Sequence, residues 1–170
     1  MALMAAREFP LGWRCNNPGN IRPNKAWTWL GEIEPLVTPT AGSYCRFDRP
    51  VMGLRALVRD CRNKRRRGLD TIRKIKSAYA PAADGNDVAA YSRTVANTIS
   101  RILGITVGPD SALPADTPAT RIALAKATVL VELGNPYNYP SPPVVLPWWY
   151  DEDTYLEAVR LEDPGAFRAP

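Results

Sequence analysis

The sequence predicts an α+β fold that is mainly α, with one β-hairpin and an extended C-terminal arm. Three observations predict it: apolar residues recur at helical spacing in four segments between residues 50 and 133, only residues 31–47 resemble strands, and residues 139–149 contain four prolines. A chain of 170 residues can bury one sizeable core. We therefore expect an N-terminal arm (1–12), one helical domain (13–138), and a Pro-rich arm with a short acidic helix (139–170).

The hairpin is predicted from GEIEPLVTP and SYCRF, which flank a Thr-Ala-Gly turn at residues 40–42. Side chains alternate along a strand, so Glu32 and Glu34 should share one face. Pro35 cannot donate to the ladder and should interrupt it beside Glu34.

Four helices should follow the hairpin. The first begins at Pro50 with Asp48 as its cap and ends at Gly68. The second has Asp70 as its cap and ends before Pro81. The third runs from Asp87 to Leu103, and the fourth starts at Thr117-Pro118 and ends at Gly134. Apolar residues at three- and four-residue spacing should form their buried faces: Val51, Leu54, Leu57, Val58, Cys61, Ile72, Ile75, Tyr79, Val88, Tyr91, Val95, Ile99 and Ile102.

The C-terminal arm, YPSPPVVLPWW, should be largely extended, with a short acidic helix near residues 153–161. It is too short to form a core of its own. We expect Trp148 and Trp149 to pack on the body of the domain or on another subunit.

Composition excludes several classes of function. The chain contains no histidine, and its three cysteines show no CxxC spacing, so zinc sites and histidine-dependent triads are excluded. We expect no metal and no cofactor. No apolar run is long enough for a membrane span, and the N-terminus lacks the pattern of a Sec signal, so the protein is expected to be made in a cytoplasm.

The formal net charge is +5, and basic residues concentrate between residues 62 and 76. Such a cluster can attract a polyanion, or it can be a solvated helix end where cations are favoured. A nucleic-acid binder is a further reading, although no aromatic residues are interleaved there. The basic patch comprises Arg62, Lys64, Arg65, Arg66, Arg67, Arg73, Lys74 and Lys76.

The stretch CNNPGNIRPNKAW, residues 15–27, combines a Pro-Gly turn with asparagines and a tryptophan. Asparagine tolerates left-handed backbone and bonds its own chain, so the pattern is typical of a tight structural loop. The same amides could also bind a ligand.

Several motifs together resemble a family of tailed-bacteriophage virion proteins. They are CNNPGNIR, a Trp and Gly pair, YCRFDRPVMGLRALVRD, LDTIRKIKSAYAP and VLVELGNPY, in that order over residues 14–137. The first motifs also resemble the asparagine-rich hairpin of cell-wall N-acetylglucosaminidases. The last resembles the glutamate helix of lytic transglycosylases and goose-type lysozymes, which in those enzymes precedes the hairpin. The resemblance implies a lysozyme-like domain whose glutamate helix has moved to the C-terminal side, as circular permutation would produce.

The resemblance also assigns roles to residues. A carboxyl group must protonate the leaving oxygen of the β-1,4 bond of peptidoglycan, and Glu132, between Val131 and Leu133, is the candidate general acid. An inverting hydrolase needs a second carboxylate, for which Glu34 and then Glu32 are candidates, whereas a lytic transglycosylase needs none. Candidate glycan-binding residues are Asn16, Asn17, Asn20, Trp27, Trp29, Tyr44, Asn135, Tyr137 and Tyr139.

The sequence departs from the family pattern at Val131, where the family has histidine, and in the spacing from Glu132 to Asn135, which is one residue shorter. Position 49, which tends to be serine in the family, is Arg49. Two functions therefore stay open. One is a virion-borne muramidase or lytic transglycosylase that opens the cell wall during DNA delivery. The other is an inactive structural part of the phage particle, present in several copies, that contacts other virion proteins through the basic patch and the Pro/Trp-rich arm.

Overall fold

The computed structural model describes residues 8–40, 42–139 and 145–167. Helices form most of this part of the chain, and one antiparallel pair of strands completes it, which confirms the α+β, mainly α prediction. The elements are α1 (Leu11–Arg14), β1 (Glu32–Thr38), β2 (Gly42–Phe47), α2 (Pro50–Arg66), α3 (Ile72–Tyr79), α4 (Val88–Leu103), α5 (Pro118–Leu133) and α6 (Glu152–Glu162), with short 3-10 turns at Ala82–Asp84, Pro136–Asn138 and Pro164–Phe167.

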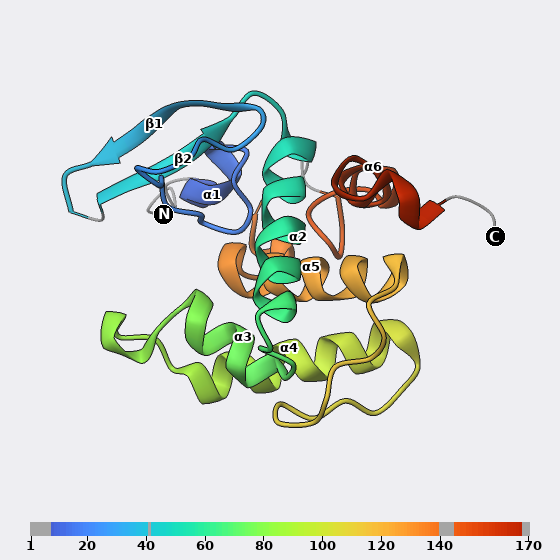
Figure 1. Ribbon diagram of the computed structural model, residues 1–170. Coiled ribbons are helices and arrows are strands. Elements are labelled where there is room, and N and C mark those ends of the chain that lie inside the picture. Colours follow the sequence, from blue (N-terminus) through green and yellow to red (C-terminus); the bar gives the residue numbers. More distant parts are fainter. Residues whose placement is uncertain (1–7, 41, 140–144, 168–170) are drawn as a thin grey trace, which may run out of the picture.

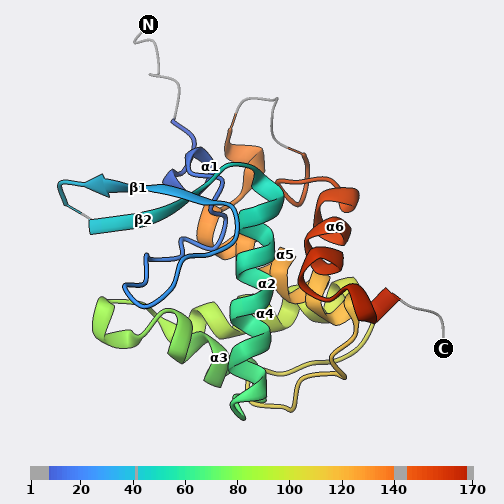
Figure 2. The ribbon, with the colours of Figure 1, turned by 45° about the horizontal axis from the view of Figure 1, so that its top comes forward.

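Helix α2 runs through the middle of the molecule (Figure 1). The hairpin and α1 lie on one side of its N-terminal half and α6 lies on the other, while α3 and α4 lie at its C-terminal end (Figures 1 and 2). Helix α5 packs along α4 and also contacts α1, α2 and α6. This arrangement brings the end of α5 close to the segment that follows α1.

The predicted apolar face of α2 forms the centre of the core. Leu54 and Leu57 are fully buried, and Val51, Val58 and Cys61 are at most 7% exposed. Burying an aliphatic side chain of this size contributes roughly 1.5–3 kcal/mol. The periodicity of the sequence therefore located the packing face of this helix correctly.

The sequence predicted the caps of three helices, of which Thr117 is correct and Asp48 and Asp70 are wrong. Asp87, the predicted start of the third helix, is the cap of α4. Asp87 accepts a hydrogen bond from Ala90 N, and Thr117 accepts one from Thr120 N. The cap of α2 is Arg49 rather than Asp48, because Pro50 occupies the first helical position. Thr71 rather than Asp70 caps α3, since its hydroxyl accepts from Lys74 N.

The hairpin pairs Glu32 with Phe47 and Leu36 with Tyr44, and a bulge between Ile33 and Leu36 shifts the register. The prediction that Pro35 interrupts the ladder is thus confirmed. The bulge interrupts the regular alternation beside Glu34, and the two carboxylates differ in burial: Glu32 is half-buried and Glu34 is exposed.

The asparagine turn, residues 15–20, docks on α2. Asn16 and Asn20 both adopt left-handed backbone, at φ 51° and 49°. The turn lies so close to α2 that a Cβ atom on Gly53 would come 1.8 Å from the carbonyl oxygen of Asn16. Glycine at this position therefore permits the turn to sit against the helix.

The described C-terminal residues, 145–167, pack on the body of their own chain. Trp149 is fully buried and its indole Nε1 donates to the carbonyl oxygen of Gly134 at 2.8 Å. The Tyr155 hydroxyl donates to the carbonyl oxygen of Trp148 at 2.7 Å. These contacts place the segment in the same core as residues 13–138. Residues 1–7, Ala41 of the predicted turn, 140–144 and 168–170 lie outside the described residues.

Within the described ranges, every helix is too short or too polar to span a membrane.

Candidate catalytic site

Glu132 lies in the last turn of α5 and faces the asparagine turn. The Nδ2 atom of Asn20 donates to Glu132 Oε2 at 2.9 Å and approaches the Glu132 carbonyl oxygen at 3.4 Å. The hydroxyl of Tyr91, on α4, donates to Glu132 Oε1 at 2.5 Å. Three segments far apart in the sequence thus meet at one half-buried carboxyl group.

These contacts hold both oxygens of the Glu132 carboxylate in place. Each carboxylate oxygen has two lone pairs, and each accepts one of the two donors described. The group is therefore held in position by neutral donors, an amide and a phenol, without an ion pair to a lysine or arginine at hydrogen-bond distance among the described residues. Fixed orientation of this kind is what a general acid requires.

Lys76, on α3, is buried next to the rings of Tyr79 and Tyr91, close to the Glu132 site. Lys76 is fully buried and its Nζ donates to Thr128 Oγ1 at 2.7 Å. The same Nζ lies 4.6 Å from the ring centroid of Tyr79 and 5.2 Å from that of Tyr91. Burial lowers the pKa of Lys76, and the charge of Glu132 partly opposes this.

Both tyrosines hold part of the site. Tyr79 donates its hydroxyl hydrogen to the carbonyl oxygen of Gly19 in the asparagine turn, while Tyr91 donates to Glu132. Burial, followed by the nearby charge of Glu132, raises the pKa of both hydroxyl groups well above their ordinary value. Both therefore remain protonated donors at any pH near neutrality.

A hollow of about 410 Å³ adjoins this cluster, and we call it the asparagine hollow. Asn20, Tyr79 and Trp27 line it. Glu132 is not among the lining residues, and its carboxylate is connected to the lining by the hydrogen bond from Asn20. The complete lining consists of residues 19–24, Trp27, Trp29, Asp60, Lys64, Ala78 and Tyr79. Trp27 is 54% exposed and meets Trp29 edge to face, with ring centroids 6.4 Å apart.

Not all of the predicted asparagines reach this hollow. Asn17 is fully buried, and its side chain bonds the backbone of Ile21 and Cys45. The expectation that its amide is presented to a glycan is therefore wrong, since its donors and acceptor are used to build the turn. Asn16 donates to the carbonyl oxygen of Phe47 at 2.9 Å and lines a different hollow.

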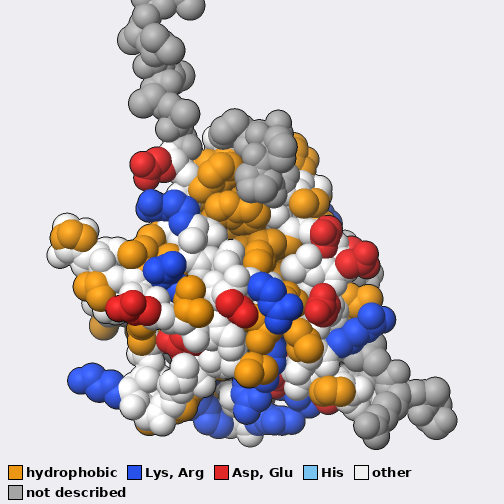
Figure 3. Space-filling view, turned by 90° about the horizontal axis from the view of Figure 1, so that it is seen from above, with side chains coloured by type: hydrophobic (Ala, Val, Ile, Leu, Met, Phe, Trp, Pro, Cys, Tyr) orange, Lys and Arg blue, Asp and Glu red, His pale blue; other side chains and the backbone are white. Residues whose placement is uncertain are grey.

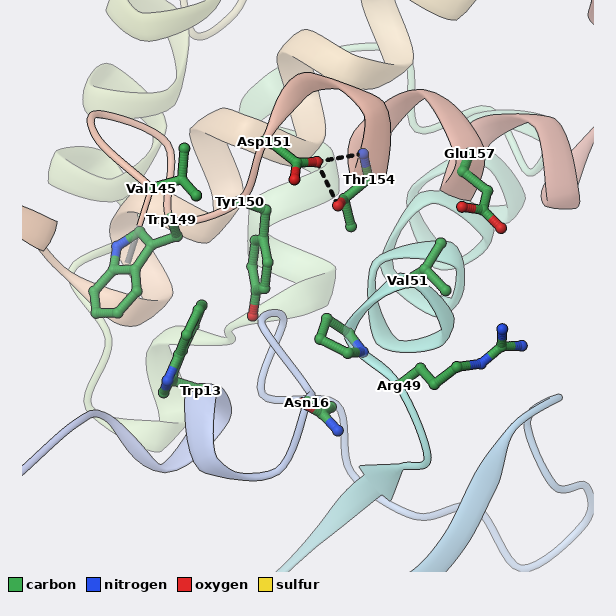
Figure 4. Close-up of a pocket in the computed structure, with 11 residues that line it drawn as sticks. Trp13, Asn16, Arg49, Val51, Val145, Trp149, Tyr150, Asp151, Thr154 and Glu157 are labelled. Carbon is green, nitrogen blue, oxygen red and sulfur yellow. Dashed lines mark hydrogen bonds between the residues drawn. The ribbon is translucent and has the colours of Figure 1, made fainter. Parts of the chain in front are cut away.

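That second hollow has a volume of about 670 Å³ and lies between α1, the start of α2 and the start of α6. Figure 4 shows Trp13 and Tyr150 side by side at one end of it, and Arg49 and Glu157 at the other. Asp151 is used to cap α6, because its Oδ1 accepts from both the backbone and the hydroxyl of Thr154. Asn16 of the asparagine turn thus lines this second hollow, whereas Asn20 lines the asparagine hollow.

The remaining candidate glycan ligands are dispersed. Tyr44 lies under the guanidinium of Arg22, 3.9 Å from the ring centroid. Tyr139 stacks on Phe9 with centroids 5.4 Å apart, so it belongs to the aromatic cluster around Trp149. Asn135 accepts from the backbone of Tyr137, and these two residues line a separate hollow of about 310 Å³.

The two candidate second carboxylates differ in their surroundings. Glu32 accepts a hydrogen bond from the backbone N–H of Trp29 at 2.8 Å, so it stabilises the loop at residues 27–30 that carries Trp27 and Trp29. Glu34 is exposed beside the bulge. Neither is among the residues that line the asparagine hollow, whereas Asp60, which the sequence did not indicate, lines it and is paired with Lys64.

The basic patch is divided by the fold. Arg62, Arg65 and Arg73 pair with Asp163, Asp116 and Asp110, Lys64 pairs with Asp60, and Lys74 pairs with Asp70. Lys76 is buried, and Arg66 and Arg67 are exposed. Acidic and basic side chains are also interspersed over the face that carries the hairpin and α6 (Figure 3). The structure therefore does not present the eight residues as one exposed cationic surface.

Sequence reasoning placed Tyr79 and Tyr91 on buried helical faces but did not identify their hydrogen bonds to the site. Only the fold shows that their hydroxyl groups reach Gly19 and Glu132. Among the described residues, no three His, Cys, Asp or Glu side chains converge as metal ligands would. No protein-family model and no curated protein matches the chain.

Proposed function

We propose that this protein is a bacteriophage virion-associated protein that binds peptidoglycan and cleaves its glycan strands, with Glu132 as the proton donor. The observation that supports this is the hydrogen bonding of Glu132 to Tyr91 and to Asn20. Of these three residues, Asn20 lines the asparagine hollow, and Glu132 lies next to the hollow through its hydrogen bond to Asn20. The virion context rests on the resemblance of the motifs in residues 14–137 to phage virion proteins.

The surroundings of the acidic residues favour a lytic transglycosylase over an inverting hydrolase. An inverting hydrolase needs a free second carboxylate to activate water. Glu32 is bonded to the Trp29 backbone, Glu34 is exposed, and Asp60 is paired with Lys64. One carboxyl group is sufficient when a hydroxyl of the substrate is the nucleophile.

In the proposed reaction, Glu132 donates its proton to the glycosidic oxygen as the bond from that oxygen to the anomeric carbon breaks. The 6-hydroxyl oxygen of the same muramyl residue then bonds to the anomeric carbon. The proton of that hydroxyl returns to the Glu132 carboxylate, so the enzyme ends in its starting state. The glycan leaves with a 1,6-anhydro ring.

The alternative of an inactive particle component that docks through the Pro/Trp-rich arm gains no support from the tryptophan pair. Trp149 is fully buried in its own chain, and Trp148 is half-buried beside Arg101 and Lys126. Partners in the virion remain a proposal that rests on the resemblance.

The test is the clearing of purified peptidoglycan by wild type and Glu132→Gln. Loss of a general acid should lower the rate by about 10²- to 10⁴-fold. Glu157→Gln, which removes an exposed carboxylate on α6, is the matched control and should clear like wild type. No clearing by wild type, or equal clearing by Glu132→Gln, would refute the proposal.

A further inference from the structure

Lys76, on α3, is a buried lysine without a carboxylate partner. Its side chain is fully buried, and its Nζ forms no ion pair with an acid among the described residues. Two other lysines of the basic patch, Lys64 and Lys74, pair with Asp60 and Asp70. Burying an ammonium without a counter-ion is unfavourable for folding. The fold therefore retains a charged group at a position that an apolar side chain could fill.

The groups around Lys76 Nζ are those that favour an ammonium. The Thr128 hydroxyl donates to the carbonyl oxygen of Leu124 at 2.7 Å, so its oxygen accepts from Nζ, also at 2.7 Å. The ring centroids of Tyr79 and Tyr91 lie 4.6 and 5.2 Å from Nζ, within the range of cation–π interactions. An oxygen lone pair and two ring faces carry partial negative charge, so they stabilise the protonated form. Burial acts in the opposite sense and lowers the pKa of this lysine.

The two rings that Lys76 faces belong to the two tyrosines that hold the site. Tyr91 donates to Glu132 Oε1, and Tyr79 donates to the carbonyl oxygen of Gly19 in the asparagine turn. A positive charge over the face of a phenol ring draws electron density from it, and a donor polarised in this way forms a stronger hydrogen bond. One ammonium is therefore placed to strengthen both the bond to the acid and the bond to the turn.

Tyr91 gives the clearer measure of the effect of Lys76. The ring centroid of Tyr79 also lies 5.2 Å from the Nζ of Lys64, which is paired with Asp60. Lys76 is the only cation over the ring of Tyr91 among the described residues. The hydrogen bond of the Tyr91 hydroxyl should therefore respond to Lys76 alone.

We infer that Lys76 is a positioning residue for the proposed reaction, because its buried ammonium strengthens the hydrogen bonds of Tyr91 and Tyr79 and thereby fixes Glu132 against the asparagine turn. Lys76 is fully buried, so it acts through the two tyrosines and not on the substrate. The effect of Lys76 on the rate rests on the proposed function. Its effect on the two hydrogen bonds can be measured without catalysis.

The first test is proton NMR of the two tyrosine hydroxyl groups in the full chain. Both are buried donors, so their protons should exchange slowly with water and give separate downfield signals. Tyr79→Phe and Tyr91→Phe assign them, since each removes one signal. Lys76→Met keeps the length of the side chain and removes its charge. We expect both signals to move upfield in this variant, because a weaker hydrogen bond shields the proton more.

The second test compares the activity and the stability of Lys76→Met. It should clear peptidoglycan about three- to tenfold more slowly than wild type, because the acid is less well fixed. It should also resist urea at least as well, because it lacks the unpaired buried charge. A lysine with a merely structural role would lower both together. In the Tyr91→Phe background, Lys76→Met should slow clearing less than it does in wild type, since the two residues act through one network.

Lys126→Met is the matched control. Lys126 is 5% exposed, and its Nζ lies 5.4 Å from the ring centroids of both Trp148 and Tyr155, so it is also a buried lysine beside two aromatic rings. The Tyr155 hydroxyl donates to the carbonyl oxygen of Trp148 and not to the site. Lys126→Met should therefore leave the clearing rate and both hydroxyl signals unchanged.

An unmoved Tyr91 signal in folded Lys76→Met, or clearing by this variant at the wild-type rate, would overturn the inference and leave the proposed cleavage intact. If Lys76→Met does not fold, Lys76→Leu is measured in its place, and loss of the fold in both variants would overturn the inference in favour of a structural role. A shifted Tyr91 signal with no clearing by wild type would instead refute the proposed function and leave the effect of Lys76 on the hydrogen bond standing.

Discussion

The hydroxyl of Tyr91 and the carboxylate of Glu132 form a hydrogen bond of 2.5 Å that joins α4 to the last turn of α5. Tyr91 is buried and Glu132 is half-buried, and the carboxylate also accepts from Asn20. The orientation of the candidate acid is therefore determined by tertiary packing of two helices and one turn.

Removing the Tyr91 hydroxyl should release Glu132 from its fixed orientation. We expect Tyr91→Phe to lower the clearing rate on the order of 10- to 100-fold, because a misplaced catalytic group is inefficient. It should also destabilise the fold by about 1.5–3 kcal/mol, since a charged acceptor loses its donor. The control is Tyr150→Phe: the buried Tyr150 hydroxyl has no hydrogen-bond partner among the described residues, so its loss should be neutral or stabilising. Urea unfolding and turbidity measure the two effects, and equal behaviour of the two variants would contradict this role.

Asn20 has two roles that substitution can separate. It occupies left-handed backbone at φ 49° and its amide donates to Glu132. Asn20→Gly keeps the backbone favourable but removes the donor, so clearing should fall while the fold loses little beyond the hydrogen bond. Asn20→Ala should show the same loss of clearing with about 1 kcal/mol of additional destabilisation. Wild-type clearing by both variants would show that the amide does not position the acid.

Gly53 should be intolerant of a methyl group. Replacing a glycine inside a helix with alanine ordinarily stabilises a protein by roughly 0.5–1 kcal/mol. Here the new Cβ would lie 1.8 Å from the carbonyl oxygen of Asn16, and backbone cannot move as cheaply as a side chain. We expect Gly53→Ala to destabilise by about 2–4 kcal/mol in urea unfolding. A gain in stability would mean that the asparagine turn is not docked on α2.

The three cysteines should be inert in the native protein near neutral pH. Each is buried and free, and burial, followed by the neighbouring Glu32, raises the pKa of the Cys45 thiol to about 12. A raised pKa means that the reactive thiolate appears only at high pH, so at pH 8 almost all of this thiol is protonated. Mass spectrometry after iodoacetamide treatment at pH 8 should show no adduct on native protein and three after denaturation. Rapid alkylation of the native protein would contradict the burial.

Local signals predicted the elements well where one residue controls the outcome. Thr117 followed by Pro118 fixed the start of α5, and Asp87 fixed the start of α4. Two predicted caps were wrong by one residue. Pro50 takes the first helical position and makes Arg49 the cap in place of Asp48. The Thr71 hydroxyl caps α3 in place of Asp70, whose carboxylate pairs with Lys74. Such choices depend on geometry that a linear pattern does not contain.

The site was predicted in part. The sequence indicated Glu132 and Asn20, and the fold brings them together across 112 positions of the chain. The number of basic residues between positions 62 and 76 could not show that Lys76 is buried, because it does not indicate which of these side chains lie on the buried face of a helix. The position of Lys76 four residues after Ile72, on the apolar side of α3, was the available signal.

The most direct test of the central claim is mass spectrometry of the soluble fragments released from purified sacculi. Wild type should release glycan fragments that end in a 1,6-anhydro ring, and Glu132→Gln should release almost none over the same time. Absence of fragments with wild type, or identical fragments at the same rate from Glu132→Gln, would show that this carboxyl group does not cleave peptidoglycan.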